Sequence, residues 1–574
     1  SRSAYNGSTT VANCYNTGSI TGSNYVGGVV GYNIGDSNNG TVIDCCNAGS
    51  ITGEEDVGGV VGSSNCTVTN CYNTGEVTGI GYGRVGGVVG SDSGTVTDCY
   101  NTGSVNGEER VGGVVGHGLT ITDCYNEGSI TGKDDVGGVV GCNAYSNYNG
   151  TVTNCYNIGI VNGHERVGGV VGYNESYTTT TTVTSCYNTG SITGSNYVGG
   201  VVGYNSSNSH VTNCYNTGSI TGGNDVGGVV GYNGNNGTIT NCYNVGSVTG
   251  NYYIGGVVGY NSRSVIDCYN TGSVAGNSHI GGVAGTVYSG TVNGCYNEGS
   301  ISGKENVGGV SGGSLDSVIT NCYNTGIVIS DEDAGGVVGF NVGSIGAVTN
   351  CYNTGSVTGS KSVGGVVGNG NGTVDNCYNT GRVTGEGVSG SVAGGVVGSS
   401  GSIGAVINCY NTGIVTSDGD AGGVVGLSDG DGTVTNCYYY VDCCANSDSY
   451  GTALTNEQML RAESFEGFDF ETVWTMDGNP GYPYPKLINN FHTAVYAPIA
   501  NSGDANGDGT VNAVDALVAM RYVLGVSTEN LTPEQIAAAD FNGDGAVNAV
   551  DTLLIMRFSL GLIEAVVKEP VQDA

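Results

Sequence analysis

Residues 211–233 read VTNCYNTGSITGGNDVGGVVGYN, and close copies of this unit fill most of the chain. The cysteine of the unit marks its period, because it returns every 25 to 32 residues. Self-similarity at such a period is typical of repeat architectures, in which each unit packs mainly on its neighbours. The cysteine stands at positions 14, 45, 71, 99, 124, 155, 186, 214, 242, 268, 295, 322, 351, 377, 409 and 437.

Each unit predicts strands and turns but no helix. Short β-branched runs such as TVTNC, SIT and GGVVG alternate with Asn, Gly, Thr and Ser, which favours three short strands per unit. One unit is too small and polar to bury a core alone, whereas stacked units share an interior. We therefore expect a mainly β fold, a long parallel β-solenoid of about 16 short coils over residues 1–438. With strands ~4.8 Å apart, the rod would be roughly 75 Å long.

Two constant columns of the unit have a physical explanation. The asparagine after Cys-Tyr, from Asn16 to Asn411, is expected to stack its amides as a ladder at a corner of the coil. The Gly-Gly pair, first present as Gly27 and Gly28, suits a sharp bend or a close backbone approach. It is not a phosphate-binding loop, because no Gly-Lys-Ser/Thr follows and no helix begins there.

The repeated cysteines raise the question of a metal site or disulfides. The repeats contain no CxxC pair, and the five histidines are scattered at 117, 164, 210, 279 and 492. In-register neighbours point their Cβ atoms the same way, which suits a disulfide badly. We expect a buried column of free thiols, which would fit an anaerobic habitat, with Cys443 and Cys444 as the exception.

The tyrosine next to the cysteine occurs in 15 of the 16 units, with Cys46 replacing it once. If the strand alternates, this side chain faces outward. Two interpretations remain open: a tyrosine stripe that stacks on sugar rings, or an aromatic ladder that simply stabilises the stacked strands.

One column varies while its surroundings stay constant, which indicates an exposed turn. Neighbouring coils should bring Asp56 near Arg84, and Asp135 near both Arg110 and Arg166, as weak surface ion pairs. The column comprises Tyr25, Asp56, Arg84, Arg110, Asp135, Arg166, Tyr197, Asp225, Tyr253, His279, Asn306 and Asp333.

The composition changes near residue 440. All six prolines lie at or after Pro480, and Trp474 and every phenylalanine but Phe340 also lie beyond that boundary. The net charge of −35 disfavours nucleic acid and anionic membranes as partners, and the sequence contains no membrane span. The chain enters the repeats almost at once without a signal peptide, so we interpret it as a mature form or a fragment.

The units resemble the GLUG repeat of large bacterial surface proteins, and residues 439–487 resemble the segment usually found after such repeats. Thr455 and Gln458 form a predicted capping box for one short helix. Phe465, Phe468, Phe470 and Trp474 supply an apolar cluster. We expect this segment to cap the last coil, because an open sheet edge invites aggregation.

Two further segments, separated by 36 residues, predict calcium loops. Residues 504–525 read DANGDGTVNAVDALVAMRYVLG and residues 540–561 read DFNGDGAVNAVDTLLIMRFSLG. Both place oxygen ligands at the EF-hand offsets 1, 3, 5, 7, 9 and 12, with glycine at 6, so two Ca²⁺ ions are expected. The predicted ligands are Asp504, Asn506, Asp508, the Thr510 carbonyl, Asn512 and Asp515 in the first loop, and Asp540, Asn542, Asp544, the Ala546 carbonyl, Asn548 and Asp551 in the second.

Each loop runs into an amphipathic helix, with Leu517, Met520 and Leu524 repeated as Leu553, Met556 and Leu560. This duplication resembles a type I dockerin, a small all-α module that binds cohesins, here over 504–563 with a linker at 488–503 and a tail at 564–574. The resemblance implies partner contacts at Ala513, Val514, Met520, Arg521 and Gly525, and at Ala549, Val550, Met556, Arg557 and Gly561. Ala-Val departs from the Ser-Thr common at the first two positions, which leaves the cohesin class open.

These features predict a secreted, non-catalytic rod displayed on a cohesin-bearing scaffold, in contact with polysaccharide or a host surface glycan. The alternative is a polysaccharide-degrading component whose enzyme is the rod or a missing upstream domain. The repeats show no recurring motif that fixes the paired carboxylates such an enzyme would need.

Overall fold

The structure is a computed structural model with two compact units, Ser1–Asn489 and Asn490–Ala574. It describes residues 10–33, 40–144, 149–176, 178–343, 345–387, 390–401, 404–428, 432–444, 450–476, 484–488 and 513–523, together with the single residues 539, 547, 552, 555 and 556.

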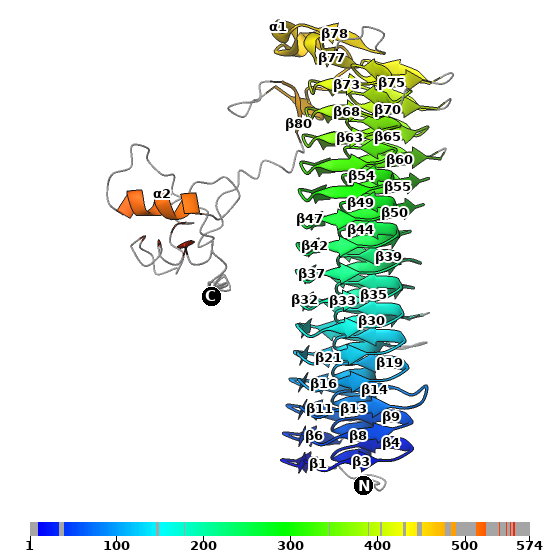
Figure 1. Cartoon of the computed structure of the whole chain (residues 1–574), viewed down its shortest axis with the longest axis vertical. Coiled ribbons are helices and arrows are strands. Elements are labelled where there is room, and N and C mark those ends of the chain that lie inside the picture. The colour runs from blue at the N-terminus through cyan, green and yellow to red at the C-terminus, as the bar shows by residue number, and fades with distance from the viewer. Residues whose placement is uncertain are drawn as a thin grey trace. The chain divides into compact units, whose positions relative to one another are not determined.

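The first unit is a parallel β-solenoid of about 15 turns with little helix (Figure 1). A typical coil contains five short strands rather than the three that were predicted. The two additional strands arise because the Cys-Tyr-Asn segment and the variable turn also pair with their neighbours. In the coil containing Cys214 the strands are β36 (Ser209–Thr212), β37 (Tyr215–Asn216), β38 (Ile220–Thr221), β39 (Asn224–Gly227) and β40 (Val230–Asn233).

Equivalent strands of successive coils form five parallel sheets, and identical positions of the repeat lie opposite one another. The sheets have 16, 17, 15, 15 and 15 strands. They run from β1 (Thr10–Ala12) to β76 (Thr433–Thr435), from β2 (Tyr15–Asn16) through β77 (Tyr438–Tyr440) to β78 (Thr452–Leu454), from β3 (Ile20–Thr21) to β73 (Val415–Ser417), from β4 (Asn24–Gly27) to β74 (Asp420–Gly422), and from β5 (Val30–Asn33) to β75 (Val425–Ser428).

The predicted asparagine ladder is confirmed. From Asn16 to Asn411, each side-chain Nδ2 donates to the Oδ1 of the equivalent asparagine one coil later, at 2.7–2.8 Å. The same Nδ2 also donates to the glycine carbonyl two residues on, at 2.8 Å in Asn216. Buried amides are thereby paired within the ladder, which stops at Asn411, whose Nδ2 lies 3.3 Å from the Cys443 Sγ.

The Gly-Gly pair is required for a close backbone approach. A Cβ atom on Gly227 would overlap the Val230 carbonyl oxygen, and one on Gly228 would overlap both the Gly256 carbonyl and the Asn244 side chain. The second glycine thus makes room for the asparagine ladder. The glycine and asparagine columns, which were predicted separately, therefore depend on each other.

Two apolar cores run along the solenoid. One contains the cysteines and the paired valines, such as Cys214, Val229 and Val230, and the other contains residues such as Ile220 and Val226. The residue before each cysteine is left-handed, for example Asn213 at φ 54°. Asn, Asp, Ser or Gly occupies this column, and Asn, Asp and Gly are the residue types that tolerate this conformation best.

The segment after the last coil covers more than the edge of that coil. Strand β78 pairs with β77, and the capping box of Thr455 and Gln458 starts helix α1 (Asn456–Met459). The Trp474 Nε1 reaches back along the rod to Asn376 Oδ1 at 3.2 Å. The aromatic cluster therefore buries the last tyrosines of the stripe, with Leu454, Met459, Phe465, Phe468, Trp474 and Leu487 packed on Tyr323, Tyr352, Tyr378, Tyr410 and Tyr438. The remaining cap elements are η2 (Val441–Cys443), η3 (Ala462–Ser464), β79 (Trp474–Thr475) and β80 (Lys486–Leu487).

Replacing Asn216 with alanine should destabilise the surrounding coils, because it leaves the Asn188 amide donor and the Asn244 oxygen buried without their ladder partner. Each such loss costs ~1–3 kcal/mol, so we expect a local destabilisation on the order of 3 kcal/mol. Hydrogen exchange of the neighbouring strands measures it. The exposed neighbour Thr217 provides the control, and Thr217→Ala should leave exchange unchanged. Equal protection in the two variants would contradict the ladder's role.

Candidate functional site

The second unit contains the residues predicted to bind calcium and cohesin. Helix α2 (Ala513–Val523) begins where the first loop was expected to end, and it includes the predicted ligand Asp515. The other predicted ligands lie outside the described residues: Asp504, Asn506, Asp508, Thr510, Asn512, Asp540, Asn542, Asp544, Ala546, Asn548 and Asp551.

The structure describes some of the residues that were predicted to contact a partner. Ala513, Val514, Met520 and Arg521 belong to α2, and Met556 packs beside the core of this unit. Gly525, Ala549, Val550, Arg557 and Gly561 lie outside the described residues.

The core of this unit joins the two halves of the duplication. Ala516 and Ala519 of α2 are buried with Ala539 and Ile555, and Val547 of the second predicted loop packs on them. Of the predicted apolar positions, Leu517 is 48% and Met520 36% exposed, and Leu524 lies outside the described residues; Tyr522 is also 38% exposed. The two alanines, spaced three residues apart, indicate the buried face of the helix. They were missed because larger apolar side chains stand beside them in the sequence.

On the solenoid, the variable column belongs to a row of turns that we call the variable edge: residues 23–25, 54–56, 108–110, 133–135, 164–166, 195–197, 223–225, 251–253, 277–279, 304–306, 331–333 and 360–362, together with Arg84. Its last position is left-handed in most coils, as at Tyr197, Asp225 and Tyr253. In-register pairing of the adjacent strands stacks these turns into a row.

The predicted ion pairs of Asp56 with Arg84 and of Asp135 with Arg166 are present, but the two carboxylates are buried rather than exposed. Asp56 and Asp135 are only 2% and 8% exposed. The Arg84 Nε donates to Asp56 at 2.5 Å, and the Arg166 Nε donates to Asp135. Arg110 acts on Asp135 electrostatically. Pairing with an arginine of the following coil partly compensates for the burial of each carboxylate.

Burial raises the pKa of the Asp56 and Asp135 carboxyls, although their arginines oppose the shift. Desolvation therefore outweighs the ion pair, as is common for buried pairs. Between Asp56 and Arg110 the edge forms a pocket of about 560 Å³, lined by Glu54, Glu55, Ile80, Gly81, Tyr82, Gly83 and Arg84 as well. Burial, with the charges of Arg84 and Arg110, lowers the pKa of His117 to about 4.

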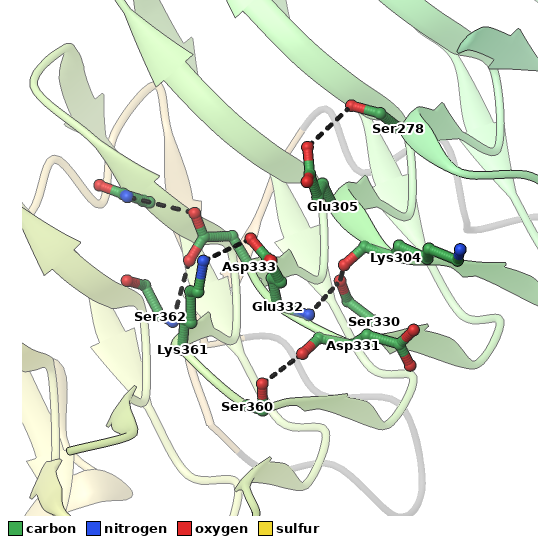
Figure 2. Close-up of polar contacts among 11 residues, drawn as sticks. Ser278, Lys304, Glu305, Ser330, Asp331, Glu332, Asp333, Ser360, Lys361 and Ser362 are labelled. Carbon is green, nitrogen blue, oxygen red and sulfur yellow. Dashed lines mark hydrogen bonds and ion pairs between the residues drawn. The ribbon is translucent and has the colours of Figure 1, made fainter. Parts of the chain in front are cut away.

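Further along the edge, Figure 2 shows a network in which the carboxylates of Glu305, Glu332 and Asp333 have partners. Lys361 Nζ donates to Glu332 at 2.5 Å, and Ser278 Oγ donates to Glu305 at 3.4 Å. The Asp333 carboxylate accepts from the Ser362 amide at 3.0 Å and from Asn369 Nδ2 at 3.3 Å. This segment therefore shows a stabilising polar network rather than free catalytic carboxylates.

The tyrosine stripe is an aromatic ladder. From Tyr72 to Tyr410 successive rings stack at 4.7–5.2 Å with interplanar angles of 2–13°. Neighbouring rings occupy the ring faces, so the geometry favours the structural interpretation over stacking on sugars.

The cysteine column is buried except for Cys14, and all 21 cysteines are free thiols, Cys443 and Cys444 included. Burial raises the pKa of thiols such as Cys295 and Cys409, which keeps them protonated and unreactive. Among the residues that the structure describes, no group of three or more His, Cys, Asp or Glu side chains could hold a metal ion.

None of the helices in the described part of the chain is both long and apolar enough to cross a membrane.

Comparison with protein families gives two matches. The model of the dockerin type I domain matches residues 502–558, which include both predicted calcium loops. The GLUG motif matches residues 53–78, 163–193, 194–221, 222–249, 250–275, 331–358 and 359–384.

No curated protein and no solved structure matches the chain. A dockerin implies attachment to a cohesin-bearing scaffold, and the GLUG motifs coincide with coils of the solenoid. The chain therefore contains a type I dockerin domain and seven GLUG motifs.

Proposed function

We propose that this protein is a secreted, non-catalytic rod that its dockerin attaches, in a calcium-dependent manner, to a cohesin-bearing scaffold outside the cell. The observation that carries the proposal is the dockerin match over residues 502–558, which coincides with the duplicated loop and helix sequences.

The residues of both loops fit Ca²⁺ as a ligand. Each loop offers Asp and Asn oxygens, which this hard cation prefers, around a glycine. Two observations agree with such loops: α2 starts at Ala513, within the first loop motif, and Val547 of the second loop packs on the core of the unit. The ion would neutralise and fix these carboxylates, and thereby hold the helices in place.

The exposed face of α2 supports a protein partner. Leu517, Met520 and Tyr522 expose apolar surface on one short helix, and protein interfaces favour aromatic residues and methionine at their centres. Met520 is one of the positions that the dockerin resemblance assigns to cohesin contact. Leu517 and Tyr522 extend that surface beyond the predicted positions.

For the rod we propose a binding or spacing role. Its side chains are largely committed to the stacking itself: the asparagines to the ladder, the cysteines to the core and the tyrosines to one another. In Figure 2 the carboxylates of Glu305, Glu332 and Asp333 accept hydrogen bonds from serine, lysine, asparagine and backbone donors.

Chelating calcium should unfold the dockerin and spare the rod, because the loop carboxylates repel one another without the ion. Hydrogen exchange of the full chain, with and without EDTA, separates peptides of 504–563 from those of the solenoid. The double variant Asp508→Ala/Asp544→Ala should behave like the chelated protein even in calcium. The assignment fails if EDTA deprotects the coils and leaves residues 504–563 unchanged.

Because Ala-Val and Met-Arg recur in both halves, the dockerin should bind one cohesin in two orientations related by a half-turn. Changing Ala513 and Val514 to charged residues should then leave affinity nearly intact, since Ala549 and Val550 remain. Changing both pairs should abolish binding, because unpaired charge is strongly unfavourable at an interface core. Calorimetry against a panel of type I cohesins decides it. Complete loss from one single-face variant would show that only one face is used.

A non-catalytic rod should release no product from polysaccharides, whether or not it binds them. A glycan array, run together with a reducing-sugar assay on the full chain, tests this directly. Binding without product agrees with the proposal. Release of product would instead support the polysaccharide-degrading alternative.

A further inference from the structure

Four aspartates occupy the last position of the variable edge in different coils, and three of them share a left-handed backbone. Asp56, Asp135 and Asp225 all precede the valine of the Gly-Gly strand, and all three are left-handed, with φ of 49°, 55° and 52°. A shared backbone conformation at a shared position places their carboxyls alike in the coil. The chain thus contains three versions of one local site.

Two of these sites already hold a guanidinium group. Arg84, one coil after Asp56, makes a forked contact in which Nε donates to Oδ1 at 2.5 Å and Nη2 to Oδ2 at 3.1 Å. Arg166, one coil after Asp135, donates through Nε in the same way and also lies 5.4 Å from the Tyr173 ring centroid. An aspartate here therefore pairs with an arginine from the next coil.

The third site lacks its cation. The residue one coil after Asp225 is Tyr253, and within the described residues Asp225 forms no ion pair or side-chain hydrogen bond. Asp225 is half-buried, so its carboxyl is also reachable from solvent. This carboxyl differs from the other two in its partner rather than in its place.

Aromatic rings lie near the unmatched carboxyl. Tyr197 and Tyr253 precede and follow Asp225 in the column, and the Tyr197 ring meets Tyr232 edge-on at 5.6 Å. Tyr232 stacks on Tyr260 at 5.0 Å. The titratable groups facing the carboxyl are Tyr197, Tyr232 and Tyr260, none of which is cationic. Burial raises the pKa of Asp225 to about 7.

A carboxylate bordered by tyrosine rings suits a planar cation, because the carboxylate supplies charge and hydrogen-bond acceptors while the rings add cation–π attraction. We propose that Asp225, with Tyr197 and Tyr232, binds a guanidinium group: an arginine side chain that a partner polypeptide presents to the variable edge. The net charge of −35 favours the approach of such a basic partner. The site is independent of the dockerin, so each can fail without the other.

The first test supplies the missing arginine within the chain. Tyr253→Arg should be tolerated, since Arg110 and Arg166 adopt φ of 50° and 53° at this position. A carboxyl whose pKa is raised on folding loses its stabilising effect as pH rises from about 4 toward 7. The new arginine should lower that pKa and slow hydrogen exchange of residues 195–260 at pH 8. Tyr253→Gln is the control without charge, and D225N combined with Tyr253→Arg should remove the gain.

The second test adds the ligand to the full chain. The probe is N-acetyl-arginine amide, and neutral N-acetyl-citrulline amide is its matched control. The carboxyl ¹³C signal of Asp225, identified by its loss in D225N, is followed through a pH titration. The arginine compound should lower the apparent pKa of Asp225 and the citrulline compound should not. Arginine binding, detected through the ring signals of Tyr197, should weaken at least about tenfold in D225N, which corresponds to ~1.4 kcal/mol.

Two further variants serve as controls for ligand binding at Asp225. In Asp333→Asn binding should be unchanged, because the Asp333 carboxylate is already bonded to Ser362 and Asn369. In Tyr253→Arg the added compound should have no effect, because the site is filled. Equal responses to arginine and citrulline, no response to arginine, or unaltered binding in D225N would each overturn the proposal.

Discussion

Every feature of the solenoid depends on in-register stacking of coils at the spacing of parallel strands. Stacking places each side chain against the equivalent side chain of the next coil. A constant position therefore favours residue types whose side chains pack well against identical side chains. Asparagine pairs amide with amide, tyrosine stacks ring on ring, and cysteine and valine fill the two cores. The glycines are fixed by the same condition, since the Gly-Gly strand approaches the backbone and amides of neighbouring strands.

The variable edge is the place where this condition is relaxed. At this edge the residue type differs between successive coils, and aspartate, arginine, tyrosine and histidine all occur at the same position of the repeat. Unlike neighbours then meet at coil spacing, which produces ion pairs such as Asp56 with Arg84 and networks such as that around Asp333. The constant positions thus form the same scaffold in every coil, whereas the residues of the variable edge differ in charge and polarity from coil to coil.

Much of this arrangement was predictable from sequence. The solenoid, the asparagine ladder, the buried cysteines and the capping box at Thr455 follow from periodicity and residue type. The five-strand coil was missed because strands of two residues, such as Tyr215–Asn216, have no alternation pattern to read. The burial of Asp56 and Asp135 was missed because a variable, polar column favours an exposed turn. In the dockerin, bulky Leu517 suggested a buried stripe, whereas the core uses Ala516 and Ala519.

The asparagine ladder also has a direction. Every amide donates toward the following coil and accepts from the preceding one, so the amide dipoles from Asn16 to Asn411 align head to tail. Reversing a single amide would set donor against donor at one junction and acceptor against acceptor at the other. A lone reversal therefore incurs two faults, whereas a reversal shared by neighbours incurs them only at its boundaries. The row consequently behaves as one polarised domain, in which the orientation of each amide is decided collectively.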